Sequence, residues 1–337
     1  GRNESQLPVL RRDYNFLKDS LHPDIDLTRN SGATQTNSSG LVAYAPENEL
    51  KRSTQLASWV ELGSNNVTVT AATDITDPLG GNGAFRVTTD TANVGGIYVG
   101  DPDQSKIDGV SVSSIYIRSV SGTQTTNVIH HNTVSSGLVT ITEEWQRVVI
   151  PYDASVFGSV NFYAVDFRNT ATDATDVYIF APQLNKSFTE EACEHLPTTS
   201  DFVYKERFDY TKDGDKKGLL IEEARTNLFK YTDLSNSTQN GWDWLVSGSG
   251  TTVTNAAIDP TGGKNAIKIT ANTHNTLKLF RANSVPTTSV GTEYCMSIYV
   301  KDAGTRYFNF YLNDSGAKML KVDLQTGQVD SFTGTGN

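Results

Sequence analysis

Three pairs of adjacent glutamates are the residues of this chain best suited by type to acid–base chemistry: Glu143-Glu144, Glu190-Glu191 and Glu222-Glu223. Neighbouring residues of a strand point to opposite faces of a sheet, so the two carboxyl groups of one pair cannot flank a glycosidic bond. The histidine pair His130-His131 diverges for the same reason and is a poor metal site. The chain contains no G-x-S-x-G, Walker or H-E-x-x-H pattern. We therefore predict a protein that is not an enzyme.

Loop aspartates offer one place for a cofactor. Asp101 and Asp103 flank a proline, and Asp173 and Asp176 lie three residues apart. Carboxylate oxygens are ligands that Ca²⁺ takes in proteins. The alternative for such loop acids is simple hydration, and both interpretations stay open. Apart from a structural calcium ion at these residues, no cofactor is expected.

Four aromatic residues are candidates for stacking on sugar rings: Trp59, Tyr98, Trp242 and Trp244. A flat aromatic face exposed on a β-sheet is the physical basis of much glycan recognition. Tryptophan in a small sandwich is also commonly part of the core, so the sequence leaves both interpretations open.

The distribution of charge restricts the possible partners. The net charge of −10 lies entirely in residues 39–200, whereas residues 1–38 and 201–337 are each neutral. An acidic protein matches a nucleic-acid backbone poorly, and a carbohydrate or protein partner fits better. The longest apolar runs are a few residues long, so no membrane insertion is expected.

The chain contains an internal repeat. DPLGGNGAFRVT at residues 77–88 matches DPTGGKNAIKIT at 259–270, with six of twelve positions identical. Further on, SIYIR at 114–118 matches SIYVK at 297–301 at nearly the same offset. A period of about 180 residues is too long for a solenoid, so each copy is predicted to be a domain.

Both copies have the pattern of β-structure. Apolar and polar residues alternate in each matched segment, as they do in half-buried strands, and each Asp-Pro-x-Gly-Gly block is typical of a turn. We predict an all-β chain of tandem antiparallel jelly-roll-like β-sandwiches, preceded by a short N-terminal attachment segment. The predicted parts are an attachment segment at 1–38, an acidic first sandwich at 39–186, a connector at 187–217 and a second sandwich at 218–337.

The second copy lacks counterparts of the last strands of the first copy. After its central strand the first copy continues through EWQRVV at 144–149 and two further strands, whereas the second copy reaches Asn337 without them. A sandwich without its last strands exposes unpaired edges. We therefore predict an incomplete second sandwich. Either the chain is a fragment of a longer polypeptide, which we favour, or another chain supplies the missing strands.

Two segments have a distinctive order of residues. One is DLTRNSGATQTNSSGL at residues 26–41, and the other combines RFDY at 207–210 with GLLIEEARTNL at 218–228. Together they resemble a motif that recurs in structural proteins of tailed bacteriophages, chiefly tail fibres and other virion appendages. In the usual pattern the two segments lie close together, whereas here about 170 residues separate them, consistent with an inserted sandwich. Arg225 is a candidate for a bidentate carboxylate contact that ties the sheet to a neighbouring segment. The motif residues expected to have structural roles are Arg207, Asp209, Gly218, Glu222, Arg225 and Asn227.

The resemblance implies a non-enzymatic structural component of a tailed-phage virion, a tail fibre or similar appendage. Residues 1–38 would attach it to other virion proteins, three chains would form a homotrimer, and the sandwiches would contact host surface glycans. The protein would be assembled in the host cytoplasm and located in the virion, on the tail or the particle surface.

Two alternatives remain open. One is a head fibre or capsid decoration protein. The other follows from a fold-level similarity of the sandwiches to jelly-roll carbohydrate-binding modules. In that case the chain would be a module of a polysaccharide-degrading enzyme whose catalytic part lies beyond residue 337.

Overall fold

The computed structural model describes residues 15–18, 20–62, 66–90, 95–99, 110–131, 134–153, 162–168, 171–223, 228, 251–271, 289, 291–295, 297–312 and 318–333. The chain divides into two compact units, residues 1–223 and 224–337. The described residues form strands, loops and one short 3-10 helix, η1 (Leu56–Ser58). Within them, no helix has the length and apolar character needed to cross a membrane. The protein is all-β, as predicted.

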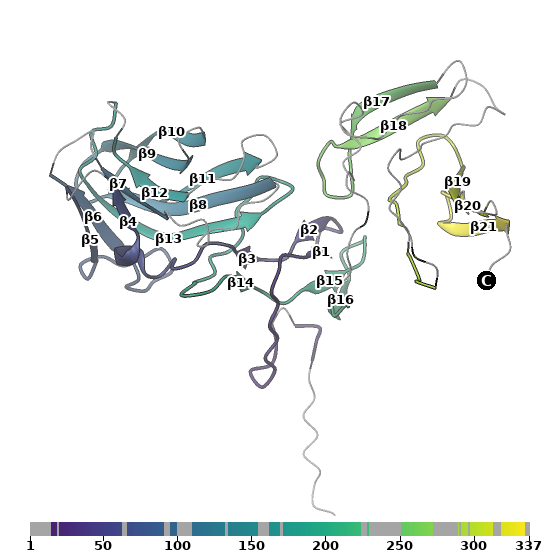
Figure 1. The fold of residues 1–337 in the computed structure, drawn as a ribbon, viewed down its shortest axis with the longest axis horizontal. Helices are drawn as coiled ribbons and strands as arrows, with labels where there is room; N and C mark the ends of the chain where they lie inside the picture. Colours follow the sequence, from purple (N-terminus) through teal and green to yellow (C-terminus); the bar gives the residue numbers. More distant parts are fainter. Residues whose placement is uncertain are drawn as a thin grey trace, which may run out of the picture. The chain divides into compact units, whose positions relative to one another are not determined.

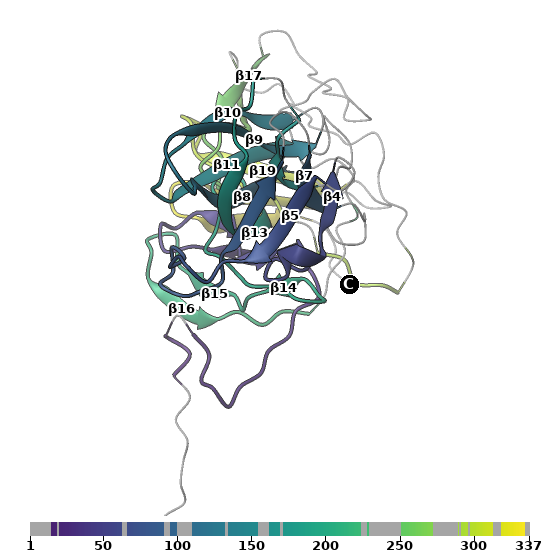
Figure 2. The same cartoon turned by 90° about the vertical axis from the view of Figure 1, so that its left-hand side faces the viewer.

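The first unit contains a sandwich of two five-stranded antiparallel sheets, drawn in blue and teal in Figure 1 and seen from another side in Figure 2. Their strand orders are β10-β9-β12-β7-β4 and β11-β8-β13-β6-β5. Strands β6 to β13 therefore follow the jelly-roll pairing, with β6-β13-β8-β11 in one sheet and β7-β12-β9-β10 in the other. This confirms the predicted fold for the first copy. The strands are β4 (Val60–Leu62), β5 (Val67–Ala71), β6 (Phe85–Thr89), β7 (Gly96–Val99), β8 (Val110–Ser119), β9 (Gln124–His131), β10 (Val134–Ile141), β11 (Gln146–Asp153), β12 (Phe162–Asp166) and β13 (Asp176–Lys186).

Strand alternation selects the side chains of the core. Ile115 and Ile117 of β8 are fully buried in one cluster with Val177 and Ile179 of β13. The residue between the two isoleucines, Tyr116, belongs to a different cluster on the outer face of the same sheet. The apolar–polar pattern of the sequence thus becomes an inner and an outer face, as expected for a strand.

The outer face of the β11-β8-β13-β6-β5 sheet is itself covered. Tyr178 and Phe180 of β13 are buried there in a cluster that includes Ala72 and Ala84. The ring of His195 lies 5.6 Å from the ring of Phe180. Burial, and then the positive charge of Arg147, lower the pKa of this histidine to about 4. This part of the sheet is therefore a second small core and not an open binding face.

An aspartate organises the turn that leads into β6. Oδ1 of Asp77 accepts hydrogen bonds from the backbone N–H of Leu79 (2.9 Å) and Gly81 (3.0 Å), and Oδ2 accepts one from Gly83 (2.8 Å). Burial alone would raise the pKa of Asp77, but these N–H donors outweigh burial and hold the pKa below its usual value. The carboxylate replaces water as the partner of three peptide groups that face the inside of the turn.

The second copy builds the same turn. Oδ1 of Asp259 accepts from the N–H of Thr261 (2.7 Å) and Gly263 (3.2 Å), and Oδ2 accepts from Asn265 (3.1 Å). Each of these residues is the counterpart, 182 positions later, of one in the first turn. The two copies therefore share the same pattern of hydrogen bonds in this turn, as well as the same sequence pattern.

The two copies differ beyond this turn. In the second unit, β17 (Thr251–Ala257) pairs with β18 (Ala266–Ala271), and β19 (Tyr307–Leu312), β20 (Lys318–Asp323) and β21 (Gln328–Thr333) form a three-stranded sheet. Its described residues form these separate small sheets, and the predicted incomplete second sandwich stays a prediction.

The strand predicted at residues 297–301 is wrong. Its counterpart in the first copy lies in β8, which pairs with β11 on one side and β13 on the other. In the second unit residues 297–301 lie outside the strands, and Tyr299 is 75% exposed. An alternating pattern forms a strand only where neighbouring strands supply its hydrogen bonds, and no described strand flanks this segment.

Replacing Asp77 with alanine should lower the free energy of unfolding of the chain by about 2 kcal/mol at pH 7, because three N–H groups lose a charged acceptor. The folded-state pKa of Asp77 is lowered, so its contribution is complete above the unfolded-state value near 3.9. It is lost as the pH falls through the still lower folded-state pKa. Urea unfolding at pH 7 and pH 3 measures both effects.

Asp90→Ala is the matched control, because Asp90 is an exposed aspartate at the end of the strand that follows the turn. It should change the free energy of unfolding by less than about 0.5 kcal/mol. Equal losses in the two variants would contradict the role assigned to Asp77.

Candidate functional site

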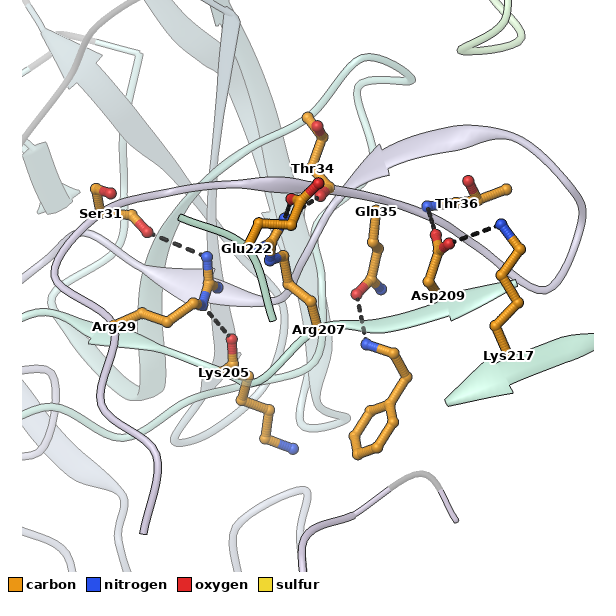
Figure 3. Close-up of polar contacts among 11 residues, drawn as sticks. Arg29, Ser31, Thr34, Gln35, Thr36, Lys205, Arg207, Asp209, Lys217 and Glu222 are labelled. Carbon is orange, nitrogen blue, oxygen red and sulfur yellow. Dashed lines mark hydrogen bonds and ion pairs between the residues drawn. The ribbon is translucent and has the colours of Figure 1, made fainter. Parts of the chain in front are cut away.

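Two β-hairpins that are far apart in sequence meet in the first unit. One is β1 (Thr34–Thr36) with β2 (Val42–Tyr44), and the other is β15 (Phe208–Tyr210) with β16 (Lys216–Leu219). Figure 3 shows the side chains that join them. We call residues 29–45 together with 206–222 the clasp. Residues 34–44 and 208–219 are therefore parts of one small structure, although about 170 residues separate them in the chain.

Three hydrogen bonds connect the first strands of the two hairpins. Nη1 of Arg207 donates to the carbonyl of Thr34 (3.1 Å), and the N–H of Phe208 donates to Oε1 of Gln35 (3.0 Å). The N–H of Thr36 donates to Oδ1 of Asp209 (2.9 Å). Each bond spans 173 residues of sequence, so the clasp is fixed by contacts that no local pattern encodes.

The guanidinium of Arg207 is largely enclosed by the clasp. Its side chain is 11% exposed, and Nη1 also donates to Oε2 of Glu222 at 2.7 Å. It therefore ties β15 both to β1 and to the segment that follows β16 (Figure 3). From the sequence we predicted that Arg225 would make such a contact with a carboxylate. Arg225 and Asn227 lie outside the described residues.

Asp209 connects a backbone amide to a lysine. Besides accepting from Thr36, it receives a hydrogen bond from Nζ of Lys217 on Oδ2 at 3.0 Å. Burial alone would raise the pKa of Asp209, but these two donors hold the pKa below its usual range. The motif carboxylates are thus engaged in holding the backbone together.

Glycines allow the two hairpin turns to touch. Gly40 has a φ of +74°, and a Cβ there would lie 2.0 Å from the carbonyl oxygen of Lys212. Gly214 has a φ of +87°, and a Cβ there would lie 2.6 Å from the carbonyl oxygen of Ser38. Gly218 lies in β16 at a φ of +116°, with the carbonyl oxygen of Phe16 3.1 Å from the position of a Cβ. Only glycine fits at the first two positions, because φ is positive and the opposing atom is backbone.

The chain passes between the clasp and the sandwich through a pair of short strands. β3 (Glu47–Asn48) pairs antiparallel with β14 (Val203–Tyr204), and the N–H of Lys205 donates to the carbonyl of Pro46 (2.9 Å). We call residues 46–49 and 203–205 the neck. The predicted domain boundaries at 38/39 and 217/218 fall inside the clasp, whereas the chain enters and leaves the sandwich at the neck.

Buried polar side chains fasten the neck to the sandwich, and the sequence analysis missed them. Oδ1 of Asn48 accepts from the N–H of Leu50 (3.1 Å) and Leu184 (3.2 Å), while Nδ2 donates to the carbonyl of Leu196 (2.7 Å). Oε1 of Gln183 accepts from the N–H of Leu196 (2.8 Å). Gln183 lies in the largely apolar segment VYIFAPQL at 177–184, and a polar residue in such a segment is the signal that would have identified it, whereas Asn48 lies between two glutamates and gives no such signal.

The structure corrects one predicted glycan-stacking residue. Trp59 is 6% exposed, belongs to the core of the sandwich, and donates Nε1–H to the carbonyl of Arg52 (3.0 Å). Its ring faces are therefore packed against protein and not available to a sugar. Tyr98 lies in β7, but its side chain, together with Trp242 and Trp244, lies outside the described residues.

The calcium candidates at Asp173 and Asp176 are engaged elsewhere. Asp176 receives two hydrogen bonds from Arg86, one from Nε at 2.8 Å and one from Nη2 at 2.5 Å. Asp173 accepts from the N–H of Thr125. In the part of the chain that the structure describes, no three His, Cys, Asp or Glu residues are grouped so that they could hold a metal ion. Asp101 and Asp103 lie outside that part.

Gly40→Ala should disrupt the clasp. The new methyl group would overlap the Lys212 carbonyl, and the positive φ adds strain of about 1 kcal/mol. We expect the hairpin amides around residues 208–219 to lose protection from hydrogen exchange by at least tenfold, measured by mass spectrometry on the full chain.

Gly122→Ala provides the control. Gly122 also has a positive φ, +64°, but a Cβ there would meet no atom within 4 Å. It should show only the conformational penalty of about 1 kcal/mol, with the clasp unchanged. An equal effect on the clasp from both substitutions would refute the close contact of the two turns.

No protein-family model matches the chain, and no curated protein matches it significantly. Among solved structures, it is similar to the CBM22-1 and GH10 modules of the xylanase Xyn10B of Clostridium thermocellum, at 16% identity and a TM-score of 0.30, over 42% of this chain and 28% of that one. It is also similar to the CBM22-1 xylan-binding domain of Xyn10C from Paenibacillus barcinonensis, at 14% identity and a TM-score of 0.30, over 47% of this chain and 97% of that domain. The likeness to carbohydrate-binding modules is weak.

Proposed function

We propose that this chain is a non-enzymatic structural component of a tailed-phage virion, a tail fibre or similar appendage. In this proposal the clasp belongs to the supporting part of the appendage and carries the first sandwich as an inserted module. The observation that supports it most strongly is the union of the two motif segments in the clasp, across the three hydrogen bonds that join β1 to β15 and its flank.

The polar groups of the motif support a structural role. Arg207 and Asp209 bond to backbone atoms of the other hairpin, and Glu222 and Lys217 bond in turn to these two residues. Groups engaged in this way hold chain segments together, which is what a supporting part of an appendage requires.

The inserted sandwich is the part that we propose meets the host surface. It lies within the acidic region of the chain, which disfavours a nucleic-acid backbone and is compatible with neutral glycans. Jelly-roll sandwiches serve as lectin domains in other proteins, which supports this step by analogy of fold alone. We further propose that residues 1–38 contribute to attachment to other virion proteins and that the appendage is a homotrimer located on the particle.

The test is to locate the protein on particles. Antibodies against the purified full chain should label purified tailed particles in immunogold electron microscopy, and mass spectrometry of the same particles should detect its peptides. Labelling at the tail supports a tail fibre, whereas labelling on the head would favour a head fibre or decoration protein. Absence of both label and peptides from intact particles would refute the proposal.

A separate experiment examines the host-facing role. The purified chain should bind glycans of the host surface on an array without releasing reducing ends from capsule polysaccharide. Release of reducing ends by the chain itself would contradict its proposed non-enzymatic role. Binding to no host glycan would remove the recognition role while leaving the location on the particle to the first experiment.

A further inference from the structure

Two carboxylates are buried at the neck. Glu47 and Glu49 are both 0% exposed and lie two residues apart, so their side chains leave the extended chain on the same side. Asn48 between them bonds to the sandwich, through Leu184 and Leu196. The neck therefore carries a pair of acids at the point where the sandwich joins the clasp.

Glu47 has little compensation for its charge. Oε1 accepts a hydrogen bond from the N–H of Lys186 (3.0 Å), but Oε2 accepts none from any described residue. A Cβ at Gly32 would lie 2.6 Å from Oε2, so the carboxylate packs against the backbone of the clasp. Burial first, and the neighbouring Glu49 second, raise the pKa of Glu47 to about 7.

The charged groups that act on Glu47 are Glu49, Lys186 and Arg29. Arg29 and Lys186 oppose the rise in its pKa, but Arg29 also donates Nε–H to the carbonyl of Lys205 (2.6 Å) and lies over the ring of Tyr204 (5.7 Å). Figure 3 shows Arg29 directed toward Lys205 and Ser31. The guanidinium is therefore shared among several acceptors and does not belong to Glu47 alone.

Tyr204 and Cys193 also lie beside the two glutamates, and neither side chain carries a positive charge. The hydroxyl of Tyr204 donates to Oε1 of Glu49 at 3.0 Å. Sγ of Cys193 lies 3.4 Å from the carbonyl oxygen of Glu47, and burial raises the pKa of this thiol to about 11. Beyond them, Glu206 and Arg207 act on Arg29 with opposite signs. Near neutral pH, protonation of the Glu47 carboxylate therefore stabilises the folded neck.

We propose that the neck is a pH-dependent joint, in which protonated Glu47 holds the sandwich on the clasp and ionised Glu47 loosens the contact between β3 and β14. Because the folded-state pKa is raised, the stabilisation is complete below the unfolded-state value near 4.5 and is lost as the pH rises through about 7. This goes beyond the proposed function, since it applies to the chain whatever surface the sandwich meets.

Hydrogen exchange of the full chain between pH 5 and pH 8.5, corrected for the intrinsic rate, tests the joint. Protection of the neck amides, such as those of Glu49 and Lys205, should fall by roughly tenfold to a hundredfold over this range. The core strands β8 and β13 should keep their protection. In Glu47→Gln, which is neutral at every pH, the protection of the neck should not depend on pH.

Glu61→Gln is the matched control, because Glu61 lies exposed on β4 and should leave the wild-type pH profile unchanged. A wild-type profile of the neck that is flat across the range would overturn the proposal, and this result needs no variant to fold. A Glu47→Gln profile with the same slope as the wild type would also overturn it, since another group would then be titrating.

Discussion

The hydrogen bonds of β3 must be made within the protein, because Glu47 and Asn48 lie where water does not reach them. Its backbone pairs with β14, the N–H of Glu49 donates to the carbonyl of Leu184 (2.7 Å), and the amide of Asn48 bonds to Leu184 in β13 and to Leu196 in the connector. An unpaired buried peptide group costs about 1–3 kcal/mol. The two-residue strand β3 therefore holds together β13, the connector and the clasp.

Features encoded by neighbouring residues could be predicted from the sequence. The alternation in Phe85–Thr89 and in β8 gave the right strands, and the Asp-Pro turn gave the right conformation in both copies. The jelly-roll pairing was also right, because few arrangements bury so many short amphipathic strands. The contact between the two hairpins was not predicted, because no pattern of residues alone would have placed Thr34 beside Arg207.

Features that depend on distant partners could not be predicted. The pattern at residues 297–301 is nearly the same as that of β8, yet only β8 has flanking strands to pair with. Trp59 is in the core because the chain around η1 folds back so that Arg52 accepts its N–H, which its sequence context does not reveal. Likewise, the charge of Glu47 looks ordinary in sequence and becomes unusual only when Lys186, Gly32 and Arg29 enclose it.

The pairing of β3 with β14 has a consequence for how such a chain can change over generations. Since the sandwich begins and ends at adjacent backbone positions, its two ends are as close as those of a simple hairpin loop. Recombination can then exchange this whole cassette for another domain with equally close termini while the supporting hairpins keep their alignment. Such an exchange would leave the hairpin frame and its contacts unchanged.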